Sequence, residues 1–442
     1  MTSNMQSTFK RMCEARGLWH GAEVATHQDL SALFVARAVQ LYLRIGGRFG
    51  MVMPNAVVDR ESYRGFRTGI YEGAHDMTQV VFETSWDLRR IRPHFFPRGA
   101  SVIFGTRSDL ASAMPTAMEV WSGRVLQGNV SWSEAKLNIQ RNQGVAVQFQ
   151  RNINSPYMSR FRQGAIIAPR VCFVVNKRPA PLLGNVAGTH SVISSRSVNE
   201  KKPWKEVPSI TGFVEERFIR PFYSGENLLP FRIYGRQHAV IPVDIQRLMQ
   251  GEDEIEVYPG LSSWWNEAER IWNTYRSNEN LSLMKQLDYM GKFSSQFPMA
   301  HIRVIYNTAG MHLSAAKVDD PKTFVDSNLY WCNVQTVEEA NYLCCILNCP
   351  TTTEMLRPLM SYGKDERHVH KHIWQLPIQE YDASNSKHAR LAFLGGELTL
   401  IAASYEIRKD IHFSAARRDI RNALDLTPAA AEVRDLVYEM LS

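Results

Sequence analysis

The sequence predicts an α/β region at the N-terminal end, followed by a larger mixed α+β region and C-terminal helices. Within residues 29–43, apolar side chains recur every three or four positions, which is typical of an amphipathic helix. Two glycines and a short apolar run at 48–54 follow, and a helix, a Gly-Gly turn and a buried strand make half of an α/β unit. Further strand-like runs lie at 78–83 and 100–105. After about residue 110, short strand-like runs alternate with Pro, Gly and Asn, so the architecture is expected to change there.

Local signals mark the ends of the expected N-terminal elements. Asp29 is suited to cap the first helix, because its carboxylate can accept a hydrogen bond from a free backbone N–H. Gly46 and Gly47 are suited to end that helix. A second short helix is expected at 64–71, and a polar loop is expected at 84–99, between the two later strands.

The later elements are indicated by spacing, capping and turn composition. Residues 164–175 form a strand-like apolar run, and residues 180–208 are rich in Ser, Asn and Lys, which is typical of a surface loop. The remaining expected elements are a largely helical stretch at 262–286 capped by Ser262, a hairpin around Gly310 at 302–316, and helices at 337–347 and 427–441.

Composition places the chain among ordinary globular proteins, with 44% hydrophobic and 21% charged residues. The sequence contains no apolar run of roughly 18 residues, so no membrane span is expected. The polar residues 1–21 lack the apolar core of an export signal. The cysteines are not spaced as a disulfide framework, and Cys345 and Cys349 have no His or Cys pair at zinc spacing. We therefore expect reduced thiols, no metal and a cytoplasmic location.

Positive charge is concentrated in one stretch of the chain. The whole sequence carries +7, whereas residues 141–220 alone hold 13 Lys or Arg, 4 Glu and no Asp, a balance of +9. Such an excess is expected of a surface that meets phosphates, and it equally fits a solvated face that keeps a protein in solution. The expected DNA-binding residues are Arg160, Arg162, Arg170, Lys201, Lys202 and Lys205.

The helix and strand at 29–57 resemble a known family. They read DLSALFVARAVQLYLRIGGRFGMVMPNAV and resemble the segment that follows the catalytic NPPY-type tetrapeptide in gamma-class adenine-N6 DNA methyltransferases. The resemblance implies that Asp29 and Leu30 lie on the cofactor side, and that Pro54 and Asn55 end the fifth strand of a Rossmann-like methyltransferase sheet. The alternative is an ordinary α/β unit, since a single motif carries a risk of false matches.

Residues 94–105, HFFPRGASVIFG, resemble a second motif of the same family. There a Phe-Pro pair before the seventh strand stacks on the adenine, because an enzyme that modifies a base must flip it out of the duplex. Phe96 and Pro97 match that pair, and Phe95 is the alternative to Phe96. Two core aromatics beside a strand would be the commoner reading in isolation, but the order and spacing relative to the first motif favour the family's role.

The C-terminal half resembles the downstream region of large bacterial N6-adenine DNA methylases and, in part, the target-recognition domains of type I specificity subunits. The segments that carry this resemblance are 155–170, 214–233, 283–298, 325–350 and 370–378. It implies a C-terminal portion of a methyltransferase domain at 1–115, a DNA target-recognition region at 116–380 and a C-terminal helical segment at 381–442. Double-stranded DNA is the implied partner, in a restriction-modification or defence system.

Two further groups of residues could contact a ligand, and each also has a purely structural explanation. The alternating histidines of HVHKH at 368–372 could contact a metal or a phosphate, although polar loop residues that face DNA or solvent are the commoner case. Trp264, Trp265 and Trp272 could stack on bases, although a buried helix face is favoured.

Two parts of the family's chemistry have no match here: the Gly-rich loop that holds S-adenosylmethionine and the NPPY-type tetrapeptide that grips the adenine amino group. In the family both precede the segment that begins here at Asp29, and no NPPY, DPPY or NPPF string occurs in the sequence. We therefore expect no complete catalytic site, and S-adenosylmethionine binding only when a partner subunit supplies the missing part. The chain could be a piece of a split enzyme, a truncated product, or a catalytically inactive DNA-binding or assembly protein derived from such an enzyme.

A partial sheet also predicts an exposed edge. The strand at 48–54 would lack its neighbour, and unpaired edges are avoided in stable monomers. We expect this strand to pair with a partner chain, or the first hundred or so residues to be poorly ordered alone. The strand at 100–105 is expected to be antiparallel to its neighbours.

Overall fold

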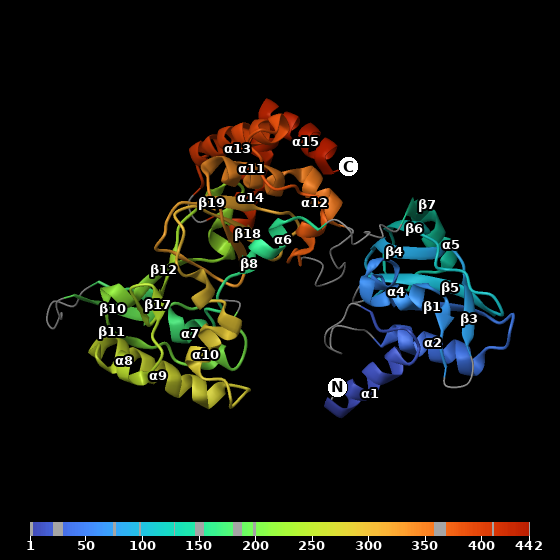
Figure 1. The fold of residues 1–442 in the computed structure, drawn as a ribbon, viewed down its shortest axis with the longest axis horizontal. Helices are drawn as coiled ribbons and strands as arrows, with labels where there is room; N and C mark the ends of the chain where they lie inside the picture. The colour runs from blue at the N-terminus through green and yellow to red at the C-terminus, as the bar shows by residue number, and fades with distance from the viewer. Residues whose placement is uncertain are drawn as a thin grey trace. The chain divides into compact units, whose positions relative to one another are not determined.

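The computed structural model shows a mixed α/β protein made of two compact units (Figure 1). Unit 1 is Met1–Asn152 with Arg357–His368, and unit 2 is Ile153–Leu356 with Val369–Ser442. The α/β class expected from the sequence is confirmed. The structure describes residues 3–20, 30–73, 77–96, 99–127, 129–145, 154–179, 188–197, 200–357, 368–408 and 411–441.

The two units differ from the three parts expected from the sequence. Residue 115 lies between two strands that belong to one sheet of unit 1. Helix α13 (Ser386–Ser404), in the part expected to be separate, packs against α11 (Val337–Asn348) inside unit 2. The expected boundaries at 115 and 380 therefore do not coincide with the division between the units.

Unit 1 is built on one seven-stranded sheet, in the order β2-β3-β5-β4-β6-β7 with β1 paired to β5. Its helices and strands in chain order are α1 (Ser3–Glu14), α2 (Ser31–Tyr42), β1 (Arg48–Pro54), α3 (Ala56–Asp59), α4 (Arg64–Arg67), β2 (Ile70–Tyr71), β3 (Thr78–Phe82), β4 (Ser85–Arg92), β5 (Ala100–Ser108), β6 (Ala117–Arg124), α5 (Trp132–Asn138) and β7 (Ile139–Val145).

Strand β5 is the centre of this sheet, because β1, β3 and β4 all pair with it in antiparallel fashion. Gly105 of β5 pairs with Phe49 of β1 and with Phe82 of β3, so β1 and β3 flank β5 and run in the same direction. β4 continues along the edge that β3 occupies, and it is parallel to β6. The strands expected at 48–54 and 100–105, and the antiparallel direction of the second, are confirmed.

Strand β1 is an edge strand in the part of the chain that the structure describes, where β5 is its one pairing partner. The backbone N–H of Asn55 donates to the Gly99 carbonyl, and that of Arg107 donates to the Gly47 carbonyl. The odd-numbered residues of β1 therefore direct their polar backbone groups toward β5.

The even-numbered residues of β1 face the other edge, because polar backbone groups alternate along an antiparallel strand. The N–H groups of Arg48, Gly50 and Val52 consequently point toward that edge. Pro54, the next residue in the series, has no N–H, as is usual for prolines in edge strands.

The prediction of a polar loop at 84–99 is wrong for its first half, which forms β4. Ser85 and Asp87 are buried in this strand, whereas Trp86 between them is half-buried. The inward-facing positions thus carry polar residues, and an alternation of apolar and polar residues does not reveal the strand. The short helix expected at 64–71 is confirmed only in α4, after which the chain forms β2.

One face of the unit 1 sheet carries the hydrophobic core, in which Val35 of α2 packs with Phe66 of α4 and Ile103 of β5. The amphipathic helix expected from the sequence is confirmed as α2. Asp29, its expected cap, lies outside the described residues, and Leu30 occupies the N-cap position without a side-chain hydrogen bond.

Unit 2 contains a six-stranded sheet, in the order β11-β10-β9-β15-β12-β20, and a four-stranded sheet, in the order β19-β18-β21-β8. Its remaining helices and strands in chain order are α6 (Tyr157–Arg160), β8 (Arg162–Gln163), α7 (Arg170–Phe173), β9 (Val174–Lys177), β10 (Thr189–Ser194), β11 (Thr211–Glu215), β12 (Ile219–Tyr223), β13 (Leu228–Leu229), β14 (Arg232–Ile233), β15 (Gln237–Val240), β16 (Val243–Asp244), β17 (Arg247–Leu248), α8 (Glu252–Glu256), α9 (Pro259–Tyr275), α10 (Leu283–Leu287), β18 (Arg303–Asn307), β19 (Ala315–Val318), β20 (Phe324–Val325), β21 (Leu329–Asn333), α12 (Pro350–Leu356), α14 (Phe413–Asp425) and α15 (Pro428–Leu441).

Several expected elements of unit 2 are confirmed. The helices at 337–347 and 427–441 are α11 and α15, and the hairpin around Gly310 is the antiparallel pair of β18 and β19. Two segments differ in part from the expectation. Residues 164–175 contain the short helix α7 before β9, and the loop expected at 180–208 contains β10.

The helical stretch expected at 262–286 forms α9 and α10. Helix α9 begins earlier than expected, with Tyr258 instead of Ser262 at its N-cap. Pro259 occupies the first turn, where its missing N–H has no intrahelical partner to lose.

Candidate nucleic-acid interface

The carboxyl end of β1 brings together two sequence motifs that lie apart in the chain. Pro54 pairs with Ala100 at the start of β5. The backbone N–H of Asn55 donates to the Gly99 carbonyl at 2.9 Å, and the Ser101 hydroxyl donates to the Asn55 Oδ1 at 2.6 Å. Gly99 and the start of β5 are therefore held beside the end of β1. In α/β sheets, ligands bind outside the carboxyl ends of the strands.

Two exposed aromatic side chains lie in the segment between β4 and β5. Phe95 and Phe96 have exposed fractions of 41% and 40%, so they are not the core aromatics that the alternative interpretation requires. Phe96 lies three positions before Gly99, the hydrogen-bond partner of Asn55. Pro97 lies outside the described residues. Large exposed aromatic rings at the end of a strand can offer a flat apolar face to a ligand.

A buried ion pair lies on β4, which pairs with β5. The Asp87 carboxylate accepts from Arg89 through both oxygens, at 2.9 and 2.8 Å, and this orients the guanidinium. Burial raises the pKa of Asp59 in α3 to about 6, although the charges of Arg89, Arg60 and Arg67 act in the opposite direction. Cationic side chains therefore surround a carboxyl group of reduced acidity near the end of β1.

Leu30, expected on the cofactor side, lines an apolar groove between α1 and α2 instead of a polar site. The groove is also lined by Met5, Phe9 and Met12 of α1 and by Leu33 of α2. The exposed outer face of α2 adds large apolar side chains, which are Phe34, Leu41 and Tyr42.

The residues around the end of β1 do not fit S-adenosylmethionine by themselves. The Asn55 carboxamide oxygen is already engaged by Ser101, Leu30 is apolar, and Pro54 has no N–H. The Gly-rich loop that the family uses to hold this cofactor has no match in the sequence.

The first of the expected DNA-binding cations is neutralised inside unit 2. Arg160 forms ion pairs with Glu339 at 2.8 Å and with Glu380 at 2.9 Å, and its guanidinium lies 4.8 Å from the centre of the Tyr157 ring. The Glu339 side chain is 7% exposed and also accepts hydrogen bonds from the Tyr157 hydroxyl and the Gln335 N–H. This arrangement holds α6 against the start of α11.

The other expected cations are distributed over separate places. Arg170 donates to the Gln237 side chain at 2.9 Å, and Lys202 pairs with Glu206 at 2.5 Å. Arg170 and Lys202 therefore both have partners within the protein. Three expected cations have exposed side chains and form no ion pair among the described residues: Arg162 on β8, and Lys201 and Lys205 on either side of Trp204.

Sequence reasoning missed a lysine that lies close to Arg162. The Lys371 ammonium group donates to the Met158 carbonyl of α6 at 2.9 Å, at the point where α6 leads into β8. Burial and the charge of Arg162 lower the pKa of Lys371. The HVHKH stretch at 368–372 was the one feature of the sequence that pointed to this region, and its alternating histidines were singled out instead of the lysine.

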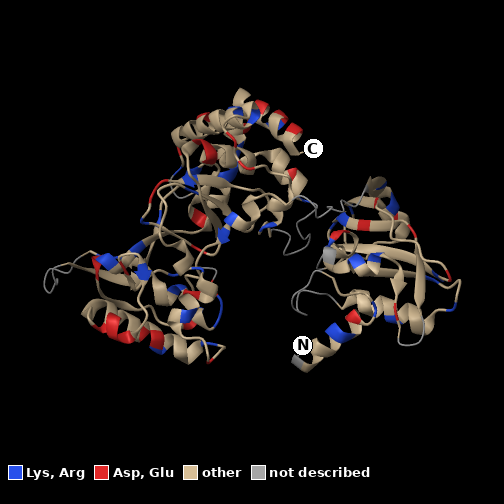
Figure 2. Ribbon diagram, in the orientation of Figure 1, with Lys and Arg blue, Asp and Glu red and all other residues tan. Residues whose placement is uncertain are grey.

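Acidic and basic residues are both spread over unit 2 (Figure 2). Acidic residues gather on α8 and α9, where the first turn of α8 contains Glu252, Asp253 and Glu254. The segment from α6 to β8 contains Arg160 and Arg162 and no acidic residue.

The remaining sequence candidates are structural. Trp264, Trp265 and Trp272 are buried against the six-stranded sheet, which confirms the helix-face interpretation. The carbonyl of His370 accepts a hydrogen bond from the Tyr306 hydroxyl at 2.8 Å. Among the described residues, no group of His, Cys, Asp and Glu is arranged to hold a metal ion. All six cysteines are buried and unpaired with one another.

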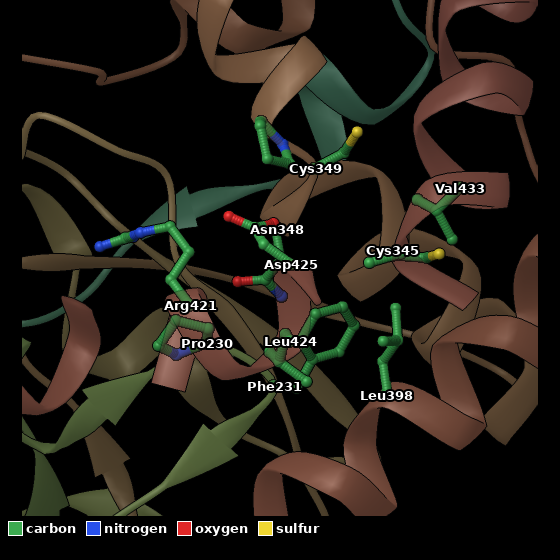
Figure 3. A pocket seen from close by; sticks show the side chains of 12 residues that line it. Pro230, Phe231, Cys345, Asn348, Cys349, Leu398, Arg421, Leu424, Asp425 and Val433 are labelled. Atoms are coloured by element: carbon green, nitrogen blue, oxygen red, sulfur yellow. The ribbon is translucent and has the colours of Figure 1, made fainter. Parts of the chain in front are cut away.

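A small cavity lies among the C-terminal helices of unit 2 (Figure 3). Cys345 and Asn348 of α11 and Asp425 of α14 line it, together with Phe231 and Leu398. Its volume of about 20 Å³ is enough for a single water molecule. It is too small for a base or a cofactor. Within the described part of the chain, no helix is both long enough and apolar enough to cross a bilayer.

Comparisons with known proteins give matches among solved structures only. No family model and no curated protein matches the chain. The chain is similar to the type IIL restriction-modification enzyme MmeI in complex with DNA, with 10% identity and a TM-score of 0.48 over 95% of this chain and 53% of that chain. It is also similar to the type IIG restriction endonuclease BpuSI (13% identity, TM-score 0.29, 98% and 52%) and to DrdV in a complex with DNA (11%, 0.38, 90% and 42%). The chain spans about half the length of the first two proteins and about two fifths of the third.

Proposed function

We propose that this chain is the target-recognition part of an adenine-N6 DNA methyltransferase of a restriction-modification system. Unit 1 supplies one wall of the site that receives the flipped adenine, and unit 2 contacts double-stranded DNA. The proposal rests on the resemblance of residues 29–57, of 94–105 and of the downstream segments to that family.

The hydrogen bond between Asn55 and Gly99 is the observation that carries the proposal. It joins the end of the first motif to Gly99 of the second motif, three positions after Phe96, and both Phe95 and Phe96 are exposed, which supports a base site at the carboxyl end of β1. A flipped base needs a flat partner next to polar groups that bind its edge. In this proposal the Phe96 ring stacks on the adenine, with Phe95 as the alternative.

The strand directions in unit 1 agree with the proposal. β1 and β3 flank the antiparallel β5, which is the arrangement expected if these are the fifth, sixth and seventh strands of a methyltransferase sheet. The free edge of β1 then receives the neighbouring strand, which belongs to a segment with the S-adenosylmethionine loop and the NPPY-type tetrapeptide. The exposed apolar side chains of α2 and the groove beside Leu30 are the surfaces that such a segment would cover.

The proposal is tested by binding of the full chain to two duplexes that differ in a single unpaired adenine. Stacking on an aromatic side chain contributes about 1–3 kcal/mol per base, so the duplex with the unpaired adenine should bind roughly 5- to 150-fold more tightly. The double substitution Phe95→Ala and Phe96→Ala should remove this preference while the affinity for the paired duplex stays unchanged.

A matched control is available in unit 2. Phe213 of β11 has an exposed fraction of 38%, close to that of Phe96, and lies outside the proposed base site. Phe213→Ala should keep the preference for the unpaired adenine. Equal binding of both duplexes by the unaltered chain, or a preference that survives the double substitution, would exclude the proposed base site.

A further inference from the structure

Two cations lie at the joint between α6 and β8 without a carboxylate partner among the residues that the structure describes. Arg162 is exposed on β8, whose backbone pairs with Trp331 of β21. Lys371 reaches the same joint and donates to the Met158 carbonyl. Neither side chain forms an ion pair with a carboxylate in the described part of the chain.

The neighbouring Arg160 differs from Arg162, because it does have carboxylate partners. Two positions before Arg162, the Arg160 guanidinium is satisfied by Glu339 and Glu380. The chain therefore neutralises one cation of this loop with two carboxylates and leaves the next one without any. Two like charges close together repel each other, so the free energy of the folded chain falls when an anion binds between them.

The turn that carries Lys371 is held rigidly. His370, directly before it, has a φ of 40°, which is a sparsely populated conformation for a residue with a side chain. Its N–H donates to the Thr308 carbonyl and its carbonyl accepts from the buried Tyr306 hydroxyl. The Trp374 indole N–H donates to that same hydroxyl at 3.0 Å. A buried hydrogen-bond network thus fixes the backbone that presents the lysine.

We propose that Arg162 and Lys371 together bind one phosphodiester of the DNA backbone. An arginine on a strand and a lysine on a rigid turn supply a planar donor pair and a point charge, a combination suited to phosphate oxygens. This assignment rests on the proposed DNA-binding function, and it adds a contact outside the stretch where the sequence concentrates its positive charge. Such a contact fixes the orientation of the duplex and carries no information about its sequence.

The assignment is tested by measuring the affinity of the full chain for a 30-base-pair duplex of mixed sequence over a range of salt concentrations. Each phosphate contact contributes about 0.9 to the slope of log affinity against log salt. Because the two cations contact one phosphate, the double variant Arg162→Ala and Lys371→Gln should lower the slope by about one such unit and weaken binding at low salt. Gln at 371 keeps an N–H donor for the Met158 carbonyl, which preserves the turn.

Lys387→Ala is the matched control, since Lys387 lies on α13 of unit 2 and pairs with Glu439 at 2.8 Å. It should leave the slope unchanged. Thermal unfolding must show the double variant to be as stable as the unaltered chain. If it is not, the single variant Arg162→Ala, which removes no side-chain hydrogen bond among the described residues, should still weaken binding at low salt. If the unaltered chain binds DNA and these variants keep its slope, the phosphate site is wrong while the proposed function stands. If the unaltered chain binds no duplex, both are wrong.

Discussion

Arg160 is expected to act on the stability of unit 2 and not on DNA. Replacing it by alanine removes the ion pairs to Glu339 and Glu380. Loss of one partner of a buried ion pair costs about 3–5 kcal/mol, because the other charge remains buried. The Arg160 side chain is 28% exposed, and Glu339 keeps the hydrogen bonds from Tyr157 and Gln335, so we expect a loss of about 2–3 kcal/mol.

Urea unfolding of the full chain measures this loss. Glu380→Gln is the control, since Glu380 is 61% exposed and its pair with Arg160 should contribute less than about 1 kcal/mol. In the same Arg160→Ala variant, the salt slope of DNA binding should equal that of the unaltered chain. A variant of normal stability whose slope falls by about 0.9 would refute the reasoning and make Arg160 a phosphate contact, as the sequence suggested.

Three further predictions concern unit 1 and the thiols. In a dilute monomer, the amides of Phe49, Met51 and Met53 should exchange slowly with solvent and those of Arg48, Gly50 and Val52 quickly; full protection of both sets would show that β1 already has a second partner. The pKa of Asp59 is raised from 3.8 to about 6, so the unfolded chain releases this proton at lower pH than the folded chain does, and stability is lost as pH rises from about 4 to 6. Asp59→Asn should therefore add on the order of 2 kcal/mol to the free energy of unfolding at pH 7 and nothing at pH 3.5. Equal effects at the two pH values would contradict this. Burial raises the pKa of Cys172 and of Cys344 to about 12, and all six thiols are buried, so iodoacetamide should label the native chain slowly and the unfolded chain fully, as mass spectrometry would detect.

Strands β1, β3 and β5 of unit 1 were predictable because they fall on short apolar runs of the sequence. By contrast, β4 was missed because its inward positions hold Ser85 and Asp87. Asp87 is tolerated there because Arg89 neutralises it. A compensating partner of that kind cannot be recognised from the periodicity of a single segment.

Helix α13 lies in the C-terminal segment expected to be helical, but it contains two glycines whose role could not be predicted from the sequence. Gly395 and Gly396 interrupt its sequence and argue against a helix, since glycine lowers helix propensity by about 1 kcal/mol. A Cβ placed on Gly395 would lie 2.3 Å from the Asn341 carbonyl oxygen of α11. The glycine is therefore required by the close approach of two helices, and only the tertiary structure reveals this.

The candidate site was partly predictable for similar reasons. The resemblance to a family drew attention to Asn55 and Phe96, and the fold joins Asn55 to Gly99, which lies three positions after Phe96. Arg160 was assigned to DNA because local composition counts charges without their distant partners, here Glu339 and Glu380. Lys371 lies outside the basic stretch, so composition gave no reason to associate it with Arg162.

The central position of β5 in unit 1 has a consequence for synthesis of the chain. β1, β3 and β4 all leave the ribosome before β5, which pairs with each of them in antiparallel fashion. At roughly 5–20 residues per second, the interval between the emergence of β1 and that of β5 lasts several seconds. During this time the apolar side chains of β1 are accessible to chaperones and to other nascent chains. Substitutions that weaken β5 should therefore reduce the yield of folded protein in the cell more than its measured stability would indicate.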